Sequence, residues 1–315
     1  MDLSAFFIDP FTLASGWDAA LRPLALVALE SVVGDIPGLR LPPCPVIGVG
    51  DSPHPLAPRL DLVVEASLSV DALAGSIAAH PVAAAVVVQL LRGIEGQGLE
   101  AALVQESLAY AVLQGSGEHA AWLAGRVAAT PSPSGSVGIE RTGDRLDLLL
   151  DRPAARNAID RDLRDALHEG FMIAALDPSI REVTLRGAGK AFCVGADLDE
   201  FGTTRDPAEA HRIRMATLPA HAIVRCRERL SVHIQGACVG AGLEMAAFAA
   251  RVTATPDAWF QLPELAMGLL PGAGGCVSLS NRIGRQRTAS LVLSGKRISA
   301  RTARSWGLVD AIVPE

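Results

Sequence analysis

The fold is decided by the stretch Gln235-Gly-Ala-Cys-Val-Gly-Ala-Gly-Leu-Glu244. The residues before it, 230–234, have alternating apolar positions, which predicts a strand, and residues 245–250 are typical of a helix. Three glycines in the stretch allow a tight turn whose backbone can approach a ligand closely. A helix that begins near Ala241 would direct unpaired N–H groups and the positive end of its dipole at this turn, where a negative oxygen is stabilised.

The stretch alone leaves three interpretations of the turn open: a phosphate site, an oxyanion site, or a turn needed only for packing. A dinucleotide-binding turn would require an acidic residue about 20 positions later, at a strand end. Glu264 has this offset, but Pro263 and the Gly- and Pro-rich residues 268–275 predict a loop there. Motifs elsewhere in the chain are needed to choose among a phosphate site, an oxyanion site and a packing turn.

Length and charge limit the class of protein. A chain of 315 residues predicts about two domains, and 28 Lys and Arg against 34 Asp and Glu give a formal net charge of −6. Because there is no basic block, we do not expect nucleic acid as a partner. The apolar run 82–91 is too short to span a membrane, and the N-terminus shows no secretory signal. We therefore expect a cytoplasmic protein with no membrane partner.

Cysteine and histidine show no metal-binding pattern. The five cysteines are scattered without a CxxC pair, and the seven histidines include no HExxH spacing. We expect reduced cysteines and no metal site. Cys193 lies in a Gly-rich turn but is interpreted as a small buried side chain, not a nucleophile.

Composition divides the chain into three parts. Residues 1–130 are expected to form a mainly helical N-terminal extension, with short strands near 46–50 and 60–64, and residues 131–136 a Pro- and Ser-rich linker. From 137 to 315, strand and helix patterns alternate, which predicts a mainly parallel α/β arrangement. The helices expected in the extension are 70–79, 82–92, 98–114 and 119–129.

Four polar residues of the extension could reach a pocket. They are His80, Glu106, Tyr110 and His119, and none of them has a catalytic spacing. Each is therefore interpreted as a solvated or helix-capping residue.

Residues from about 137 to 315 resemble the crotonase superfamily, which comprises the enoyl-CoA hydratases and isomerases. The resemblance implies a crotonase-like spiral core of ββα units, preceded by the mostly helical N-terminal region. The superfamily supports many reactions, so the resemblance is less specific for the reaction than for the fold. The blocks that carry it, in the family's order, are Arg152–Ala158, Lys190–Leu198, Gly236–Glu244, Leu262–Glu264, Gly268–Gly275, Arg282–Gly284 and Ala303–Val309.

The resemblance implies two sets of catalytic groups. The backbone amides of Ala196 and Ala241 would form an oxyanion hole for the thioester carbonyl of an acyl-CoA. Glu244 and Glu264 keep the hydratase spacing and would hold one water, with Glu264 as the main acid/base and Glu244 as the water activator. Close like charges should raise one pKa, so that one carboxyl group starts protonated.

Coenzyme A is expected as part of the substrate and not as a separate cofactor. The resemblance places it along the Asn157–Ala158 turn and residues 190–198, and it favours a homo-trimer or hexamer. Backbone groups would hold pantetheine and adenine. The residues assigned to CoA binding are Arg156, Ala158, Lys190, Ala191 and Leu198.

Four features depart from the family pattern. The sequence ends at Glu315, soon after the last block, so we do not expect the C-terminal helices usual in hydratases. Roughly 135 residues precede the core, and we expect this region to replace those helices as a cover or subunit contact. Asp199 and Glu200 stand where a basic residue often lies near the CoA phosphates, so Arg156 or Lys190 would have to compensate. Arg251 stands where an acid is usual.

The expected activity is that of a lyase, syn hydration of a 2-enoyl-CoA through an oxyanion-stabilised enolate. Isomerisation, thioester hydrolysis and cofactor-independent oxygenation of an aryl-acetyl-CoA remain open, the last because an N-terminal extension also resembles the dihydroxyphenylacetyl-CoA dioxygenase branch. The alternative from another class is a non-catalytic acyl-CoA-binding protein.

Overall fold

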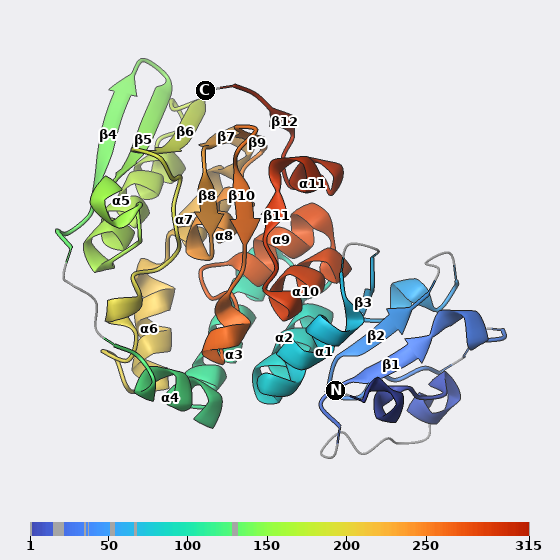
Figure 1. The fold of residues 1–315 in the computed structure, drawn as a ribbon. Coiled ribbons are helices and arrows are strands. Elements are labelled where there is room, and N and C mark those ends of the chain that lie inside the picture. The colour runs from blue at the N-terminus through green and yellow to red at the C-terminus, as the bar shows by residue number, and fades with distance from the viewer. Residues whose placement is uncertain are drawn as a thin grey trace.

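The structure, a computed structural model, describes residues 2–14, 22–34, 36, 38–50, 54–65, 68–127 and 132–314. These residues form three sheets with helices around and between them (Figure 1). Of the expected linker 131–136, residue 131 lies outside the described residues, and Ser136 already belongs to a strand.

The largest sheet has six strands in the order β12-β9-β7-β6-β5-β4. Neighbouring strands are parallel, except that β4 and β5 form the expected antiparallel hairpin. The strands are β4 (Ser136–Thr142), β5 (Arg145–Asp151), β6 (Glu182–Gly187), β7 (Leu230–Ile234), β9 (Arg251–Ala254) and β12 (Ala311–Ile312).

Helix α5 (Arg161–Leu176) covers the β4–β5 hairpin because its apolar residues recur at helical spacing. Leu163, Leu167 and Phe171 are fully buried, as are alternate residues of β5 such as Leu148. The helix begins at the expected cap, where the Asp160 carboxylate accepts the Leu163 N–H at 2.9 Å.

A smaller sheet, in the order β11-β10-β8, contains β8 (Ala237–Val239), β10 (Trp259–Gln261) and β11 (Ile298–Ser299). Gly236 leads the chain from β7 of the large sheet into β8, with φ of +57°. A Cβ at this position would overlap the carbonyl oxygen of Lys190, so only glycine fits. The following helical elements are α8 (Ala241–Ala246), the 3-10 helix η9 (Glu264–Met267), α9 (Gly275–Ile283), α10 (Arg285–Ser294) and α11 (Ala300–Ser305).

The N-terminal region begins with a parallel three-stranded sheet in the order β1-β2-β3. Strands β2 (Val46–Val49) and β3 (Leu62–Val63) fall where two strands were predicted, whereas β1 (Ala25–Ala28) was not predicted. Four helices follow at the predicted places, and the last is shorter than predicted. They are α1 (Val70–Ala79), α2 (Pro81–Ile94), α3 (Leu99–Gln114) and α4 (Gly117–Ala124).

The N-terminal helices pack directly on the crotonase-like part of the chain. Helix α3 lies against α6 (Pro207–Thr217), α7 (Pro219–Cys226) and α9, while α1 and α2 lie against α10 (Figure 1). One continuous hydrophobic core includes Leu73 and Val87 from this region together with Phe192 and Phe260. Among the described residues no single helix could cross a membrane, although α1 and α2, bent by 105° at their junction, meet the length and composition requirement as a pair.

A buried asparagine joins the first two sequence blocks of the core. Asn157 is fully buried with φ of +56°, and its Nδ2 donates to the carbonyls of Ala188, Ala191 and Phe192 at 2.9–3.0 Å. Its Oδ1 accepts the Arg152 N–H at 2.9 Å. Because buried polar groups need partners, this side chain locks the 156–158 turn onto residues 188–192.

Replacing Asn157 by Ala is expected to lower the free energy of unfolding by about 3 kcal/mol, since it leaves buried carbonyls unpaired and keeps a left-handed backbone. Urea denaturation measures the change. Asn281→Ala, at an exposed position of α9, is the matched control and should change stability by less than about 0.5 kcal/mol. Equal effects of the two substitutions would contradict this role for Asn157.

Candidate active site

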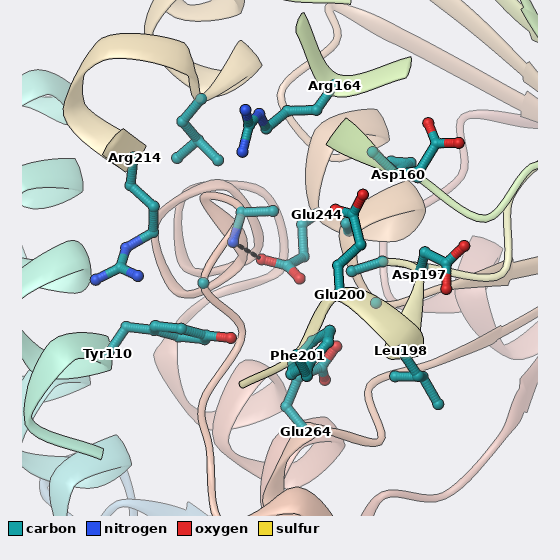
Figure 2. A pocket seen from close by; sticks show the side chains of 18 of the residues that line it. Tyr110, Asp160, Arg164, Asp197, Leu198, Glu200, Phe201, Arg214, Glu244 and Glu264 are labelled. Carbon is teal, nitrogen blue, oxygen red and sulfur yellow. Dashed lines mark hydrogen bonds between the residues drawn. The ribbon is translucent and has the colours of Figure 1, made fainter. Parts of the chain in front are cut away.

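A cavity of about 250 Å³ brings together residues that are distant in sequence. Its wall includes Ala196, Ala241, Glu244 and Glu264, which were all predicted as catalytic groups. Figure 2 shows Glu244 between two ends of the cavity, with Tyr110 and Arg214 at one end and Asp160, Asp197 and Leu198 at the other.

Two Gly-rich turns lie side by side at this cavity. Phe192 N donates to Gln235 O at 2.8 Å, and Val239 N donates to Cys193 O at 2.9 Å, which pairs the two turns like short strands. At Gly242, a Cβ would lie 2.6 Å from the Cβ of Cys193, so the close approach requires glycine. Cys193 is fully buried, and burial raises the pKa of its thiol to about 12, in agreement with the packing interpretation.

The two predicted oxyanion amides occupy positions with spare donor capacity. Ala241 is the first residue of α8, where backbone N–H groups have no acceptor within the helix. Around Ala196, Ile159 N donates to Gly195 O and Asp197 N donates to Ile159 O, both at 2.8 Å. These bonds use the groups on both sides of Ala196 and leave its own N–H for another acceptor.

Glu244 is a buried carboxylate aimed by backbone amides. Its Oε2 accepts the N–H of Ala273 at 2.7 Å and that of Gly275 at 2.9 Å, at the start of α9. Burial raises the pKa of Glu244 to about 7, although the two amides favour the charged form. Near neutral pH, this group can therefore accept a proton.

Glu264 differs from Glu244 in its hydrogen-bond partners. Its Oε2 is buried and has no hydrogen-bond partner among the described residues. Burial and the nearby Glu244 charge raise the pKa of Glu264 well above its usual value. The two predicted carboxyl groups thus lie in one cavity with different hydrogen-bond environments.

The N-terminal region contributes side chains that the sequence interpretation missed. Tyr110 lines the cavity, so the expectation of a solvated or capping residue was wrong for it. Glu106 is 1% exposed, so it is not solvated, although its carboxylate does accept an N–H at the start of α9. Glu106, Tyr110 and Gln114 are spaced four residues apart, which puts them on one face of α3. This spacing was visible in the sequence, but no motif there indicated what that face would meet.

Two histidines of this region, His119 and His80, do not line the cavity. His119 is buried, and its Nδ1 lies 2.9 Å from the carbonyl of Met267. His80 is the residue between α1 and α2, but its side chain forms no cap hydrogen bond and its Nδ1 is buried without a partner among the described residues.

The predicted CoA residues fall into two groups. Leu198 lines the cavity, whereas Arg156, Ala158, Lys190 and Ala191 lie outside its wall on the adjacent turns joined by Asn157. Arg156 and Lys190 are exposed.

The acidic residues after Leu198 have local partners. Asp199 pairs with Arg126 at 2.8 Å, so an arginine of the N-terminal region offsets part of the unexpected negative charge. Glu200 accepts the Arg161 N–H at 3.0 Å. Within the described ranges, no three His, Cys, Asp or Glu side chains are grouped as a metal site.

Comparison with known proteins identifies the family. The family model for enoyl-CoA hydratase/isomerase matches residues 146–315, more than half of the chain. The chain belongs to the enoyl-CoA hydratase/isomerase family. The crotonase resemblance is thereby confirmed.

Relatives in this family include hydratases with different substrates. The chain is 36% identical over 178 residues to mevalonyl-coenzyme A hydratase of Beauveria bassiana, covering 54% of this chain and 64% of that protein. It is 36% identical over 170 residues to 2,3-dehydroadipyl-CoA hydratase of Escherichia coli, covering 53% and 65%. The chain thus spans less than two thirds of either relative.

A solved structure shares the fold of the core. The enoyl-CoA hydratase of Thermoplasma volcanium superimposes with a TM-score of 0.52 and 35% identity, over 57% of this chain and 72% of that one. This confirms the predicted crotonase-like fold for the matched part.

The entry of Tyr110 into the cavity depends on Gly272. A Cβ at residue 272 would overlap the Tyr110 ring, so we expect Gly272→Ala to lower the free energy of unfolding by about 1–3 kcal/mol. In a Tyr110→Ala background the same change should cost at least about 1 kcal/mol less, because the overlap is removed. Thermal or urea unfolding of the four proteins measures this coupling.

Gly75→Ala is the control, since a Cβ there meets no atom within 4 Å and α1 favours alanine. It should be neutral or stabilising. Additive costs of Gly272→Ala and Tyr110→Ala would show that the two residues do not meet in this way.

Proposed function

We propose that this protein adds water to the double bond of a 2-enoyl-CoA. The observation that carries the proposal is the shared cavity of Glu244, Glu264 and the turns of Ala196 and Ala241. Two carboxyl groups with different protonation and two amides suit a reaction in which a thioester oxygen gains negative charge.

The proposed chemistry assigns one task to each group. The thioester oxygen accepts hydrogen bonds from the amides of Ala196 and Ala241, which stabilise the enolate. The water oxygen bonds to the β-carbon while Glu244 takes a proton from that water. Glu264 gives a proton to the α-carbon. A proton then passes from Glu244 to Glu264, directly or through water, which restores the starting state. One water is consumed in each cycle, and no separate cofactor is required.

The environments of the two carboxyl groups support these tasks. Amides from Ala273 and Gly275 favour the charged form of Glu244, as a base needs. The Oε2 atom of Glu264 is buried without such a partner, which favours the protonated form that an acid needs. The assignment of acid and base is the one suggested by the family pattern.

CoA binding is proposed along the 156–158 turn and residues 190–198. Leu198 and Asp197 line the cavity at the end opposite Tyr110 and Arg214 (Figure 2). An acyl group that passes Glu244 from that side would extend toward Tyr110. The N-terminal helix α3 would then form part of the acyl-binding wall.

Turnover of crotonyl-CoA and of longer and aryl-substituted enoyl-CoAs tests the proposal, with loss of the conjugated thioester absorbance as the measurement. Glu264→Gln and Glu244→Gln are each expected to lower kcat by about 10²–10⁴-fold, because each removes a proton-transfer group. Glu228→Gln, an exposed residue paired only with Arg227, is the control and should keep wild-type turnover.

Wild-type protein that binds CoA thioesters but leaves every enoyl-CoA unchanged would refute hydration. Oxygen uptake with an aryl-acetyl-CoA would then favour the oxygenase alternative. Binding without turnover of any of these thioesters would favour a non-catalytic binding protein.

The pH dependence of kcat/KM should be bell-shaped. Activity is expected to fall below about pH 7, because the base Glu244 becomes protonated as the pH drops through its pKa of about 7. It should fall again at higher pH, as Glu264, whose pKa is raised, loses the proton that it must donate. Rates measured from pH 5 to 10 check both limbs, and a profile flat through pH 7 would exclude Glu244 as the base.

A further inference from the structure

Two carboxylates from different parts of the chain share the amides that begin α9. Glu244 accepts the N–H groups of Ala273 and Gly275, while Glu106 accepts those of Gly274 at 2.7 Å and Val277 at 3.2 Å. The two acceptors therefore alternate along residues 273–275. Glu106 is separated from this segment by more than 160 residues of sequence.

We propose that Glu106 is a positioning residue for the catalytic pair, which holds the amides that aim Glu244 and keeps the proton on Glu264. The proposal rests on the proposed function for its catalytic meaning. It adds a contribution from the N-terminal region, which the family match at residues 146–315 does not include.

Glu106 holds the segment because α9 has no cap of its own. Its N-cap is Gly274, in the left-handed region with φ of +101°, and no side chain there accepts a helix N–H. The amides of 273–277 thus depend on carboxylates from α8 and α3. Without the hydrogen bonds to Glu106, residues 273–277 can rotate, and the two amides that orient Glu244 then move with them.

The electrostatic part follows from how the three carboxyl groups are compensated. Glu106 and Glu244 are buried and Glu264 is half-buried, and none of the three forms an ion pair with a described residue. Amides favour the charged forms of Glu106 and Glu244, although burial and the Glu244 charge raise the pKa of Glu106 well above its usual value. Both oxygens of Glu106 accept amides, whereas Oε2 of Glu264 has no partner among the described residues, so a proton shared by the three groups is best held by Glu264.

Other titratable groups near Glu106 do not take over this role. Arg214 stacks over the Tyr110 ring at 4.6 Å and donates to Ser107 and Gln114, and burial lowers its pKa. The thiol of Cys276 is buried, with a raised pKa. The remaining groups on elements packed against α3 are Arg92 on α2, Glu118 and His119 on α4, His211, Arg212 and Glu209 on α6, His221, Arg225 and Cys226 on α7, and Arg282 on α9.

The test compares Glu106→Gln with wild type in the pH profile of kcat/KM. Gln keeps the shape but removes the charge that raises the pKa of Glu264, so the alkaline limb should move to lower pH by about 0.5–1 unit. We also expect kcat to fall about tenfold, with KM changed less than twofold, because an amide group can accept only one of the two N–H groups well. An unchanged pH profile with a lower kcat would reduce Glu106 to a structural residue.

Two further variants separate charge from folding. Glu106→Asp keeps the charge and should retain the wild-type alkaline limb even if kcat falls. Glu118→Gln is the matched control, because Glu118 also accepts two helix amides, those of Val82 and Ala83 at the start of α2, and none of those that begin α9. It should leave the pH profile unchanged, and a shift equal to that of Glu106→Gln would overturn the proposal.

Infrared spectroscopy makes the result independent of turnover. The carboxyl stretching band of protonated Glu264, identified by its loss in Glu264→Gln, should disappear at lower pH in Glu106→Gln than in wild type. If wild type hydrates no enoyl-CoA, the proposed function fails, while this titration still decides whether Glu106 keeps the proton on Glu264. An identical band titration in both proteins would refute the inference.

Discussion

The active site depends on carboxylates that are buried against backbone amides instead of cations. The carboxylates of Glu244 and Glu106 both accept N–H groups at the start of α9, where the amides and the helix dipole stabilise negative charge. A cation would pair a carboxylate tightly and lower its pKa, whereas amides hold it in place and leave its pKa near 7 in Glu244. A group in this state can exchange protons at neutral pH, which a salt-bridged glutamate cannot do as readily.

This arrangement requires close backbone packing, which explains where glycine is needed. At Gly240, a Cβ would lie 2.6 Å from Oε1 of Glu264, and at Gly275 one would lie 2.5 Å from Cγ of Glu244. Glycine thus lets both proposed catalytic side chains lie against the backbone that forms the cavity. Asn157 holds the other turn in place through buried hydrogen bonds, so the site is built on rigid elements.

The N-terminal region is part of this construction and not an appendage to it. Helix α3 contributes Tyr110 to the cavity wall and Glu106 to the start of α9, and Arg214 of α6 ties the two helices through Ser107 and Gln114. Arg126, shortly after α4, pairs with Asp199 beside the proposed CoA path. A change in α3 can therefore alter catalysis without touching any residue of the family motifs.

The sequence by itself determined the family, the core fold and the catalytic candidates Glu244 and Glu264, because the Gly-rich turns and the spacing between the acids are local features of the chain. It also indicated the four N-terminal helices, through their periodicity. It did not predict β1, nor the roles of Glu106 and Tyr110. Only the tertiary structure decided these, because a helix face shows in sequence that it can be buried but not which amides, carboxylates or glycines it will meet.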